Sequence, residues 1–146
     1  SIGLVGSEMC IRDRDNAEIK GESASGWIND QNWIESDFLR IVQQRGKAII
    51  DARGASSATS AANAAIDTVK ATLSETSEDD WFSAAVLSDG SYNVPEGLIF
   101  GFPLRADANG KVSIVQDLPI NNYAKEKIDL TTQELLDEKN DIKDLL

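Results

Sequence analysis

Residues 81–105, WFSAAVLSDGSYNVPEGLIFGFPLR, decide the fold of this chain. Trp81–Leu87 is apolar enough for a buried strand, and the polar residues that follow it, Ser88–Ser91, are typical of a turn. Gly97–Arg105 is a second strand, in which Pro103 favours an edge position or a bulge because proline has no backbone N–H to donate. These residues therefore predict two strands joined by a short connection.

A third strand follows directly. Asn109-Gly110 is the strongest hairpin signal in the sequence, because both residues tolerate the positive φ of a type I′ turn. Lys111–Gln116 then returns as the partner of the preceding strand. The pattern predicts an antiparallel sheet of three strands.

Helices flank the sheet on both sides in sequence. Asn29 or Asp30 caps a helix that Gly54 ends, and a gap in its apolar period at Arg45 and Gly46 predicts a kink or tight packing. Ser56 or Ser57 caps a second helix that runs to about Leu73. The apolar positions of the first helix are Trp33, Ile34, Phe38, Ile41, Val42, Ala48, Ile49 and Ala52.

A short N-terminal strand, a loop and a last helix complete the predicted architecture. Ala17–Lys20 is a short strand that ends in a turn at Gly21, and Ser74–Asp80 is a loop. The last helix, 123–146, is charged. The order helix, helix, three strands, helix predicts an α+β fold, with an antiparallel sheet packed on one face by long helices. The apolar stripe of the last helix is Ile128, Leu135 and Ile142, joined by Leu136, Leu145 and Leu146.

Composition limits the classes of function. A chain of 146 residues suits one domain, and 41% hydrophobic with 27% charged residues is ordinary globular composition. No apolar run is long enough for a membrane span, and a net charge of −11 argues against binding to nucleic-acid phosphates. A single cysteine, Cys10, excludes an internal disulfide and fits a reducing compartment.

The absence of histidine removes the commonest general base and zinc ligand. A serine nucleophile has no histidine partner here, and acidic pairs such as Asp79-Asp80 are typical of solvated surfaces. The acidic stretch Asp89–Glu96 lacks the spacing of an EF-hand. The residues alone therefore predict no catalytic residue and no metal site.

Ser1–Arg14 differs from the rest, since it has no sustained period and contains the only cysteine and methionine. Its segment Gly3–Ser7 has two glycines where a dinucleotide loop needs three. The stretch resembles a translated adaptor, so we expect residues 1–14 to be a non-native leader and native sequence to begin near Asp15.

Gly54–Ser60, GASSATS, is the segment that most directly indicates a ligand. A glycine followed by hydroxyls at a helix start offers backbone N–H groups, Ser hydroxyls and the positive end of a helix dipole, which suit a carboxylate or phosphate. The alternative is a capped helix with a small-residue packing face, and composition alone favours that alternative.

Three long blocks carry a family resemblance: NWIESDFLRIVQQRGKAIIDARGASSATSAANAAIDTV, WFSAAVLSDGSYNVPEGLIFGFPLR and VSIVQDLPINNYAKEKIDLTTQELLDEK. Together they resemble the substrate domain of the NAD-dependent malate dehydrogenases, in the cytosolic-like branch of the lactate/malate dehydrogenase family. The resemblance covers residues 15–146. It implies a C-terminal α+β domain of a cytoplasmic, dimeric enzyme of malate metabolism and the tricarboxylic acid cycle, with a separate N-terminal Rossmann domain for NAD.

In such enzymes hydride passes between nicotinamide and malate or oxaloacetate, a histidine oriented by an aspartate moves the proton, and arginines hold the carboxylates. The resemblance places that histidine in an Asn-His-Ser segment just before Asp15, where this chain has no such motif. We therefore expect these 146 residues alone to be inactive and to leave NAD binding to the Rossmann domain.

The same resemblance makes Gly54, Ser56 and Ser57 substrate-pocket residues that hydrogen-bond or shape the site near a substrate carboxylate. Arg45 and Arg53 are interpreted as structural or interface ion-pair residues. The helix that begins near Asn29 resembles one at the family's dimer contact, so some of its apolar positions are expected at a subunit interface. We also expect the isolated domain to self-associate.

Two alternatives stay open. One is a stand-alone, non-catalytic dimerisation or binding domain, which needs a start at Met9 or upstream and native residues before Asp15. The other is a dehydrogenase for another 2-hydroxy acid, because lactate-type relatives share the architecture.

Overall fold

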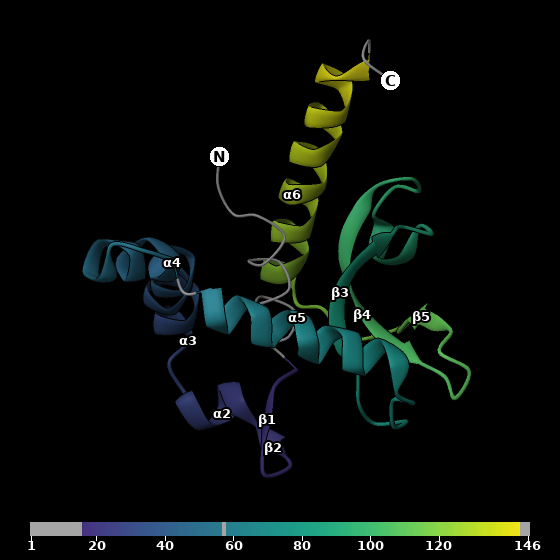
Figure 1. Ribbon diagram of the computed structural model, residues 1–146, viewed down its shortest axis with the longest axis horizontal. Helices are drawn as coiled ribbons and strands as arrows, with labels where there is room; N and C mark the ends of the chain where they lie inside the picture. The colour runs from purple at the N-terminus through teal and green to yellow at the C-terminus, as the bar shows by residue number, and fades with distance from the viewer. Residues whose placement is uncertain (1–15, 57, 144–146) are drawn as a thin grey trace.

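The computed structural model describes residues 16–56 and 58–143, which include a three-stranded antiparallel sheet, drawn at the right in Figure 1. The strands are β3 (Phe82–Leu87), β4 (Ile99–Ala106) and β5 (Val112–Ile114), in the order β3-β4-β5. The β3–β4 pairing runs without interruption from Phe82↔Leu104 to Leu87↔Ile99. The predicted α+β class and the three-stranded sheet are confirmed.

The hydrophobic core lies on one face of this sheet. Residues 100–104 of β4 are all buried, and the large side chains among them, Phe100, Phe102 and Leu104, lie on the same face because successive side chains of a strand point to opposite faces. Ile128 of α6 (Asn122–Asp141) packs into the same cluster, so this helix covers that face as predicted. The remaining buried members of the cluster are Val94 and Leu98.

Pro103 lies in the central strand without a bulge, so the prediction of an edge or a bulge is wrong. Its carbonyl accepts a hydrogen bond from the N–H of Val115 at 2.8 Å, so the hydrogen-bonding side of Pro103 faces the β5 side. The β4–β5 ladder ends at Leu104↔Ile114. The missing proline N–H therefore falls just beyond the ladder and breaks no sheet hydrogen bond.

Strand β3 is less buried than the sequence predicts. Leu87 is 61% exposed, and none of the residues of β3 is fully buried. Apolar composition alone does not distinguish a central strand from an edge strand, and β3 lies at an edge of the sheet.

The hairpin predicted at Asn109-Gly110 is present, but its turn is not type I′, because only Gly110 of the two has a positive φ (77°). The Gly110 N–H donates to the Asp107 carbonyl at 2.9 Å. The Asp107 carboxylate accepts from the N–H groups of Asn109 and Lys111 at 2.9 and 2.8 Å. This is a three-residue connection that ends in a left-handed glycine.

The two-residue turn with positive φ occurs elsewhere, at Lys20 (55°) and Gly21 (80°). It joins β1 (Glu18–Ile19) to β2 (Glu22–Ser23), and α2 (Ala24–Ile28) follows. The short strand ending in a turn at Gly21 is therefore confirmed, and its partner β2 was not predicted.

The helix predicted from residue 29 or 30 begins with a cap, since the Asp30 carboxylate accepts from the Trp33 N–H at 2.9 Å. It then runs through a short α turn, a π turn and a long α-helix before ending at Gly54. These segments are α3 (Gln31–Trp33), η1 (Ile34–Phe38) and α4 (Leu39–Arg53).

The irregularity of this helix lies at η1 and not at Arg45 and Gly46, so that prediction is wrong. A Cβ on Gly46 would meet no atom within 4 Å, which excludes tight packing there. Ile34, which is 1% exposed, lies at the start of the π turn. A gap in the apolar period marks an exposed face here and does not mark a bend.

The helix α5 (Ala58–Leu73) follows, and η2 (Ser91–Asn93) is a short 3₁₀ turn between β3 and β4. No residue of α4 is buried, and none of the described side chains of α5 is buried. None of the helices in the described residues is long and apolar enough to cross a membrane.

α6 begins one residue before the predicted start, with Asn121 as its cap, and its buried stripe is Ala124, Ile128 and Thr132. Ile142, predicted to belong to the stripe, lies just after the helix and is 46% exposed. Leu135 and Leu136 are half-buried as part of the predicted stripe. Leu145 and Leu146 lie outside the described residues.

Candidate functional site

Gly54 lies at the junction of α4 and α5, where the sequence predicts the end of the first helix. Its φ of 74° is left-handed, and its N–H donates to the Ile50 carbonyl at 2.7 Å. Glycine adopts this conformation without a Cβ clash, so α4 ends here and the chain turns toward α5. Figure 1 shows α4 and α5 separated by this connection.

The other predicted pocket residues follow Gly54. Ser56 is exposed, and Ser57 lies outside the described residues. α5 begins at Ala58, so its first N–H groups and the positive end of its dipole lie beside this segment. Gly54 and Ser56 are not among the residues that line the cavities at Tyr92–Ile128, at Glu22–Asn29 and at Val86–Ile114. Their role in a substrate pocket therefore stays a prediction.

Two basic residues were interpreted as ion-pair residues. Arg45 and Arg53 are exposed on α4, and no salt bridge within residues 16–56 and 58–143 includes either of them. The ion pair on α4 joins Lys47 to Asp51 at 3.0 Å.

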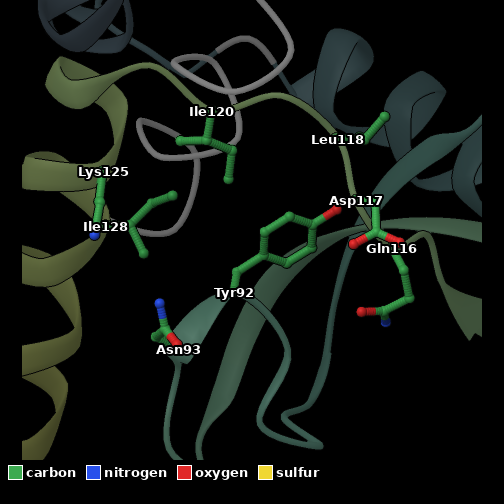
Figure 2. A pocket seen from close by; sticks show the side chains of 8 residues that line it. All are labelled: Tyr92, Asn93, Gln116, Asp117, Leu118, Ile120, Lys125 and Ile128. Atoms are coloured by element: carbon green, nitrogen blue, oxygen red, sulfur yellow. The ribbon is translucent and has the colours of Figure 1, made fainter.

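A cavity of about 310 Å³ that sequence reasoning did not predict lies between the β3–β4 loop, the segment after β5 and the start of α6 (Figure 2). Its walls combine apolar side chains with two amides, one carboxylate and one ammonium group. The lining residues are Tyr92, Asn93, Gln116, Asp117, Leu118, Ile120, Lys125 and Ile128.

Local hydrogen bonds build the walls of this cavity. The Tyr92 hydroxyl donates to the Val115 carbonyl at 2.5 Å, and the Gln116 amide donates to the Ser91 hydroxyl at 2.8 Å. Tyr92, Asn93 and Asp117 have φ values of 56°, 62° and 62°. Asn and Asp tolerate such left-handed conformations, which is the signal in the sequence that marks these turns.

Asp89 lies in the β3–β4 loop, together with Tyr92 and Asn93. A hydrogen bond from the Ser91 hydroxyl, then one from the Ser91 N–H, hold the pKa of the Asp89 carboxyl below its ordinary value. Because the carboxylate is used as a local acceptor in an exposed loop, it orders the loop and is not arranged as a general base. Within the described part of the chain, no group of three or more Asp, Glu, Cys or His side chains is arranged to hold a metal ion.

Comparison with known proteins gives a consistent result. The lactate/malate dehydrogenase alpha/beta C-terminal domain matches residues 7–146, so the match begins inside the segment expected to be a leader. A malate dehydrogenase of Cutibacterium acnes is 50% identical over 130 residues, which is 89% of this chain and 39% of that protein. The boundary at Asp15 stays a prediction.

Solved structures agree in fold. The malate dehydrogenase of Naegleria fowleri superposes with a TM-score of 0.76 and 41% identity, over 88% of this chain and 39% of that one. A lactate dehydrogenase of Trichomonas vaginalis gives a TM-score of 0.70 and 31% identity, over 76% and 34%. This chain thus spans well under half the length of the relatives that it matches. It belongs to the lactate/malate dehydrogenase family, as its α/β C-terminal domain.

Proposed function

We propose that this chain acts as the substrate domain of a malate dehydrogenase that interconverts malate and oxaloacetate with NAD. The observation that carries the proposal is sequence identity. Two malate dehydrogenases are 50% and 41% identical to the chain, whereas the lactate dehydrogenase of Trichomonas vaginalis is 31% identical. The two highest of these identities both belong to malate dehydrogenases, which favours malate over the alternative of another 2-hydroxy acid, and the family membership favours an enzyme domain over a stand-alone binding module.

The chemistry is divided between this domain and the rest of such an enzyme. The 146 residues contain no histidine, so the proton that accompanies hydride transfer has no imidazole carrier in this chain. They contain no G-x-G-x-x-G sequence either, so the residues present do not fit the NAD fingerprint, and we assign NAD binding to a separate Rossmann domain.

The contribution of this domain is to position the substrate. Ser56 lies between the turn at Gly54 and the start of α5 at Ala58, where N–H groups and hydroxyls suit a carboxylate, and Ser57 is the next residue in the sequence. These groups bind and orient a dicarboxylate without transferring its proton. The exposure of Gly54 and Ser56 supports this role, because a site shared between two domains is open when one domain is considered alone.

We infer a homodimer from the exposed apolar positions of α4, among them Ile41 and Ile50 at 49% and 47% exposure. A cytoplasmic location and a place in malate metabolism and the tricarboxylic acid cycle follow from the resemblance to the cytosolic-like branch of the family.

A chimera tests the proposed function. Residues 15–146 replace the matching C-terminal part of the Cutibacterium acnes malate dehydrogenase, which supplies its own N-terminal part. We expect the chimera to oxidise NADH with oxaloacetate and the 146-residue chain alone to show no turnover, because the chain has no histidine base. Turnover by the chain alone would contradict the assignment of proton transfer and NAD binding to a separate domain.

A matched variant of the chimera tests the predicted pocket. Ser56→Ala should raise the KM for oxaloacetate with a smaller change in kcat, since the hydroxyl is expected to bind a carboxylate and not to move a proton. Thr68→Ala, which removes an exposed hydroxyl in the second half of α5, is the control. Equal kinetic constants for both variants would contradict the prediction that the Ser56 hydroxyl binds the substrate.

A further inference from the structure

We propose that Asn109 is a site of spontaneous covalent modification, deamidation, and that Asp107 controls its rate. Asn109 is exposed in the turn between β4 and β5 and is the only asparagine in the sequence that a glycine follows. Gly110 has no side chain to shield its backbone nitrogen. A Cβ built there would have only the Thr72 carbonyl, at 3.9 Å, within contact distance, so the surroundings of the turn are open.

The reaction needs only water. The Gly110 backbone nitrogen gives up its proton and attacks Cγ of the Asn109 side chain, forming a C–N bond that closes a five-membered succinimide. The bond from Cγ to the side-chain nitrogen breaks, and ammonia leaves with the proton. Water then adds to either ring carbonyl and opens the ring to aspartate or isoaspartate, with no change in oxidation state.

The folded turn restrains the attacking nitrogen. The Gly110 N–H donates to the Asp107 carbonyl at 2.9 Å, and the Asp107 N–H donates to the Lys111 carbonyl at 3.0 Å. The Asp107 carboxylate also accepts from the N–H groups of Asn109 and Lys111. Attack requires these bonds to open, because the nitrogen must lose the proton that it donates and approach Cγ. Asp107 is therefore a positioning residue that slows the reaction.

The product changes the hairpin in two ways. A new carboxylate beside Asp107 adds a negative charge to a chain that already carries −11. Isoaspartate also inserts a methylene into the backbone of the turn that sets the register of β5 against β4. Each change weakens the pairing of the short strand Val112–Ile114 with β4.

Peptide mass mapping of the full 146-residue chain after incubation in mildly alkaline buffer tests the site. We expect amide-to-acid conversion at Asn109 in the chain unfolded by denaturant, and slower conversion in the folded chain. Asn140, an exposed asparagine followed by Asp141, is the internal control and should convert more slowly than Asn109 in denaturant. Equal rates at the two asparagines in denaturant, or equal rates at Asn109 in folded and unfolded chain, would overturn the proposal.

Variants of Asp107 test the restraint. Asp107→Ala should speed conversion of the folded chain about tenfold, which corresponds to about 1.4 kcal/mol of turn stability. Asp107→Asn retains an acceptor oxygen and should stay within about twofold of wild type. Asp129→Ala, on the exposed side of α6, controls for loss of a carboxylate. A rate for Asp107→Ala equal to that of Asp129→Ala would overturn the role of Asp107.

Discussion

Asp89 organises the loop that connects β3 to β4. Its carboxylate accepts from the N–H of Ser91 at 3.0 Å and from the Ser91 hydroxyl, which hold its pKa below the ordinary 3.8. A lowered carboxyl pKa stabilises the fold at pH values above 3.8, and this stabilisation is lost as pH falls through the lower folded-state pKa. The group is fully exposed, so the effect is small.

The expected outcome is a pH-dependent difference between wild type and Asp89→Ala. The urea midpoint of the variant should be lower near neutral pH, and the two midpoints should converge below pH 3.8 as the carboxyl group is protonated. Asp79→Ala, which removes another exposed carboxylate in a loop, is the control. If the difference between the two urea midpoints stayed the same in acid, the effect of the substitution would come from packing and not from charge.

Several single residues could be predicted from sequence because their structural roles are local. Asp30 as a helix cap and Gly54 as a helix end depend only on neighbours within one helical turn. The central position of Pro103 could not be predicted, because it depends on a hydrogen bond from the Val115 N–H to the Pro103 carbonyl across the sheet. The pocket role of Ser56 rests on the family resemblance alone.

Strand β4 supplies most of the buried aromatic core. Phe102 is 0% exposed, with its ring centroid 5.5 Å from that of Phe100 and 6.3 Å from that of Tyr92. Phe102→Ala should lower the free energy of unfolding by about 3–5 kcal/mol, because it removes a buried ring and leaves a cavity. Urea unfolding monitored by circular dichroism measures this loss.

Leu87→Ala is the matched control in the neighbouring strand. Leu87 is 61% exposed, so its truncation should change the free energy of unfolding by only about 0.5 kcal/mol. Similar losses for the two variants would show that the core does not lie on the face that carries Phe102.

The boundaries of helices and strands could be predicted where the apolar period is strong. Local hydrogen bonding, which the period does not record, determines the turn type and the helix irregularity. The extent of α5 to Leu73 and the three strands match the apolar pattern. The type of turn at Asn109-Gly110 differs from the prediction. The Asp107 carboxylate accepts from two N–H groups and so favours a longer connection. The π turn at η1 leaves no mark in the apolar spacing.

At the scale of the whole molecule, two long helices contribute no fully buried side chain among those described. Large apolar side chains on α5 are exposed on one side: Ile66 at 54%, Val69 at 56% and Leu73 at 76%. A surface of this kind is typical of an interface, so we expect the chain to self-associate as concentration rises, in spite of its net charge of −11.

Light scattering over a range of concentrations measures this association. Val69→Asp should shift the distribution toward monomer, because a carboxylate in an apolar contact is costly to desolvate. Ala64→Asp adds the same charge on the opposite side of α5 and is the control. A monodisperse monomer for wild type at all concentrations would contradict the expectation.

The family was predictable from sequence because three long blocks resemble it, and the match over residues 7–146 bears this out. The complete site was not, because the proposed function assigns the proton carrier and the cofactor loop to a separate domain. That proposal starts from the absence of histidine in these 146 residues.

Oxaloacetate-dependent oxidation of NADH by the chimera with the Cutibacterium acnes enzyme is the most direct measurement of the proposed function. We predict a kcat/KM within about tenfold of the intact enzyme, a loss of no more than about 1.4 kcal/mol of transition-state stabilisation. A chimera that folds and binds NADH but does not reduce oxaloacetate would contradict the assignment of this chain as the substrate domain of a malate dehydrogenase.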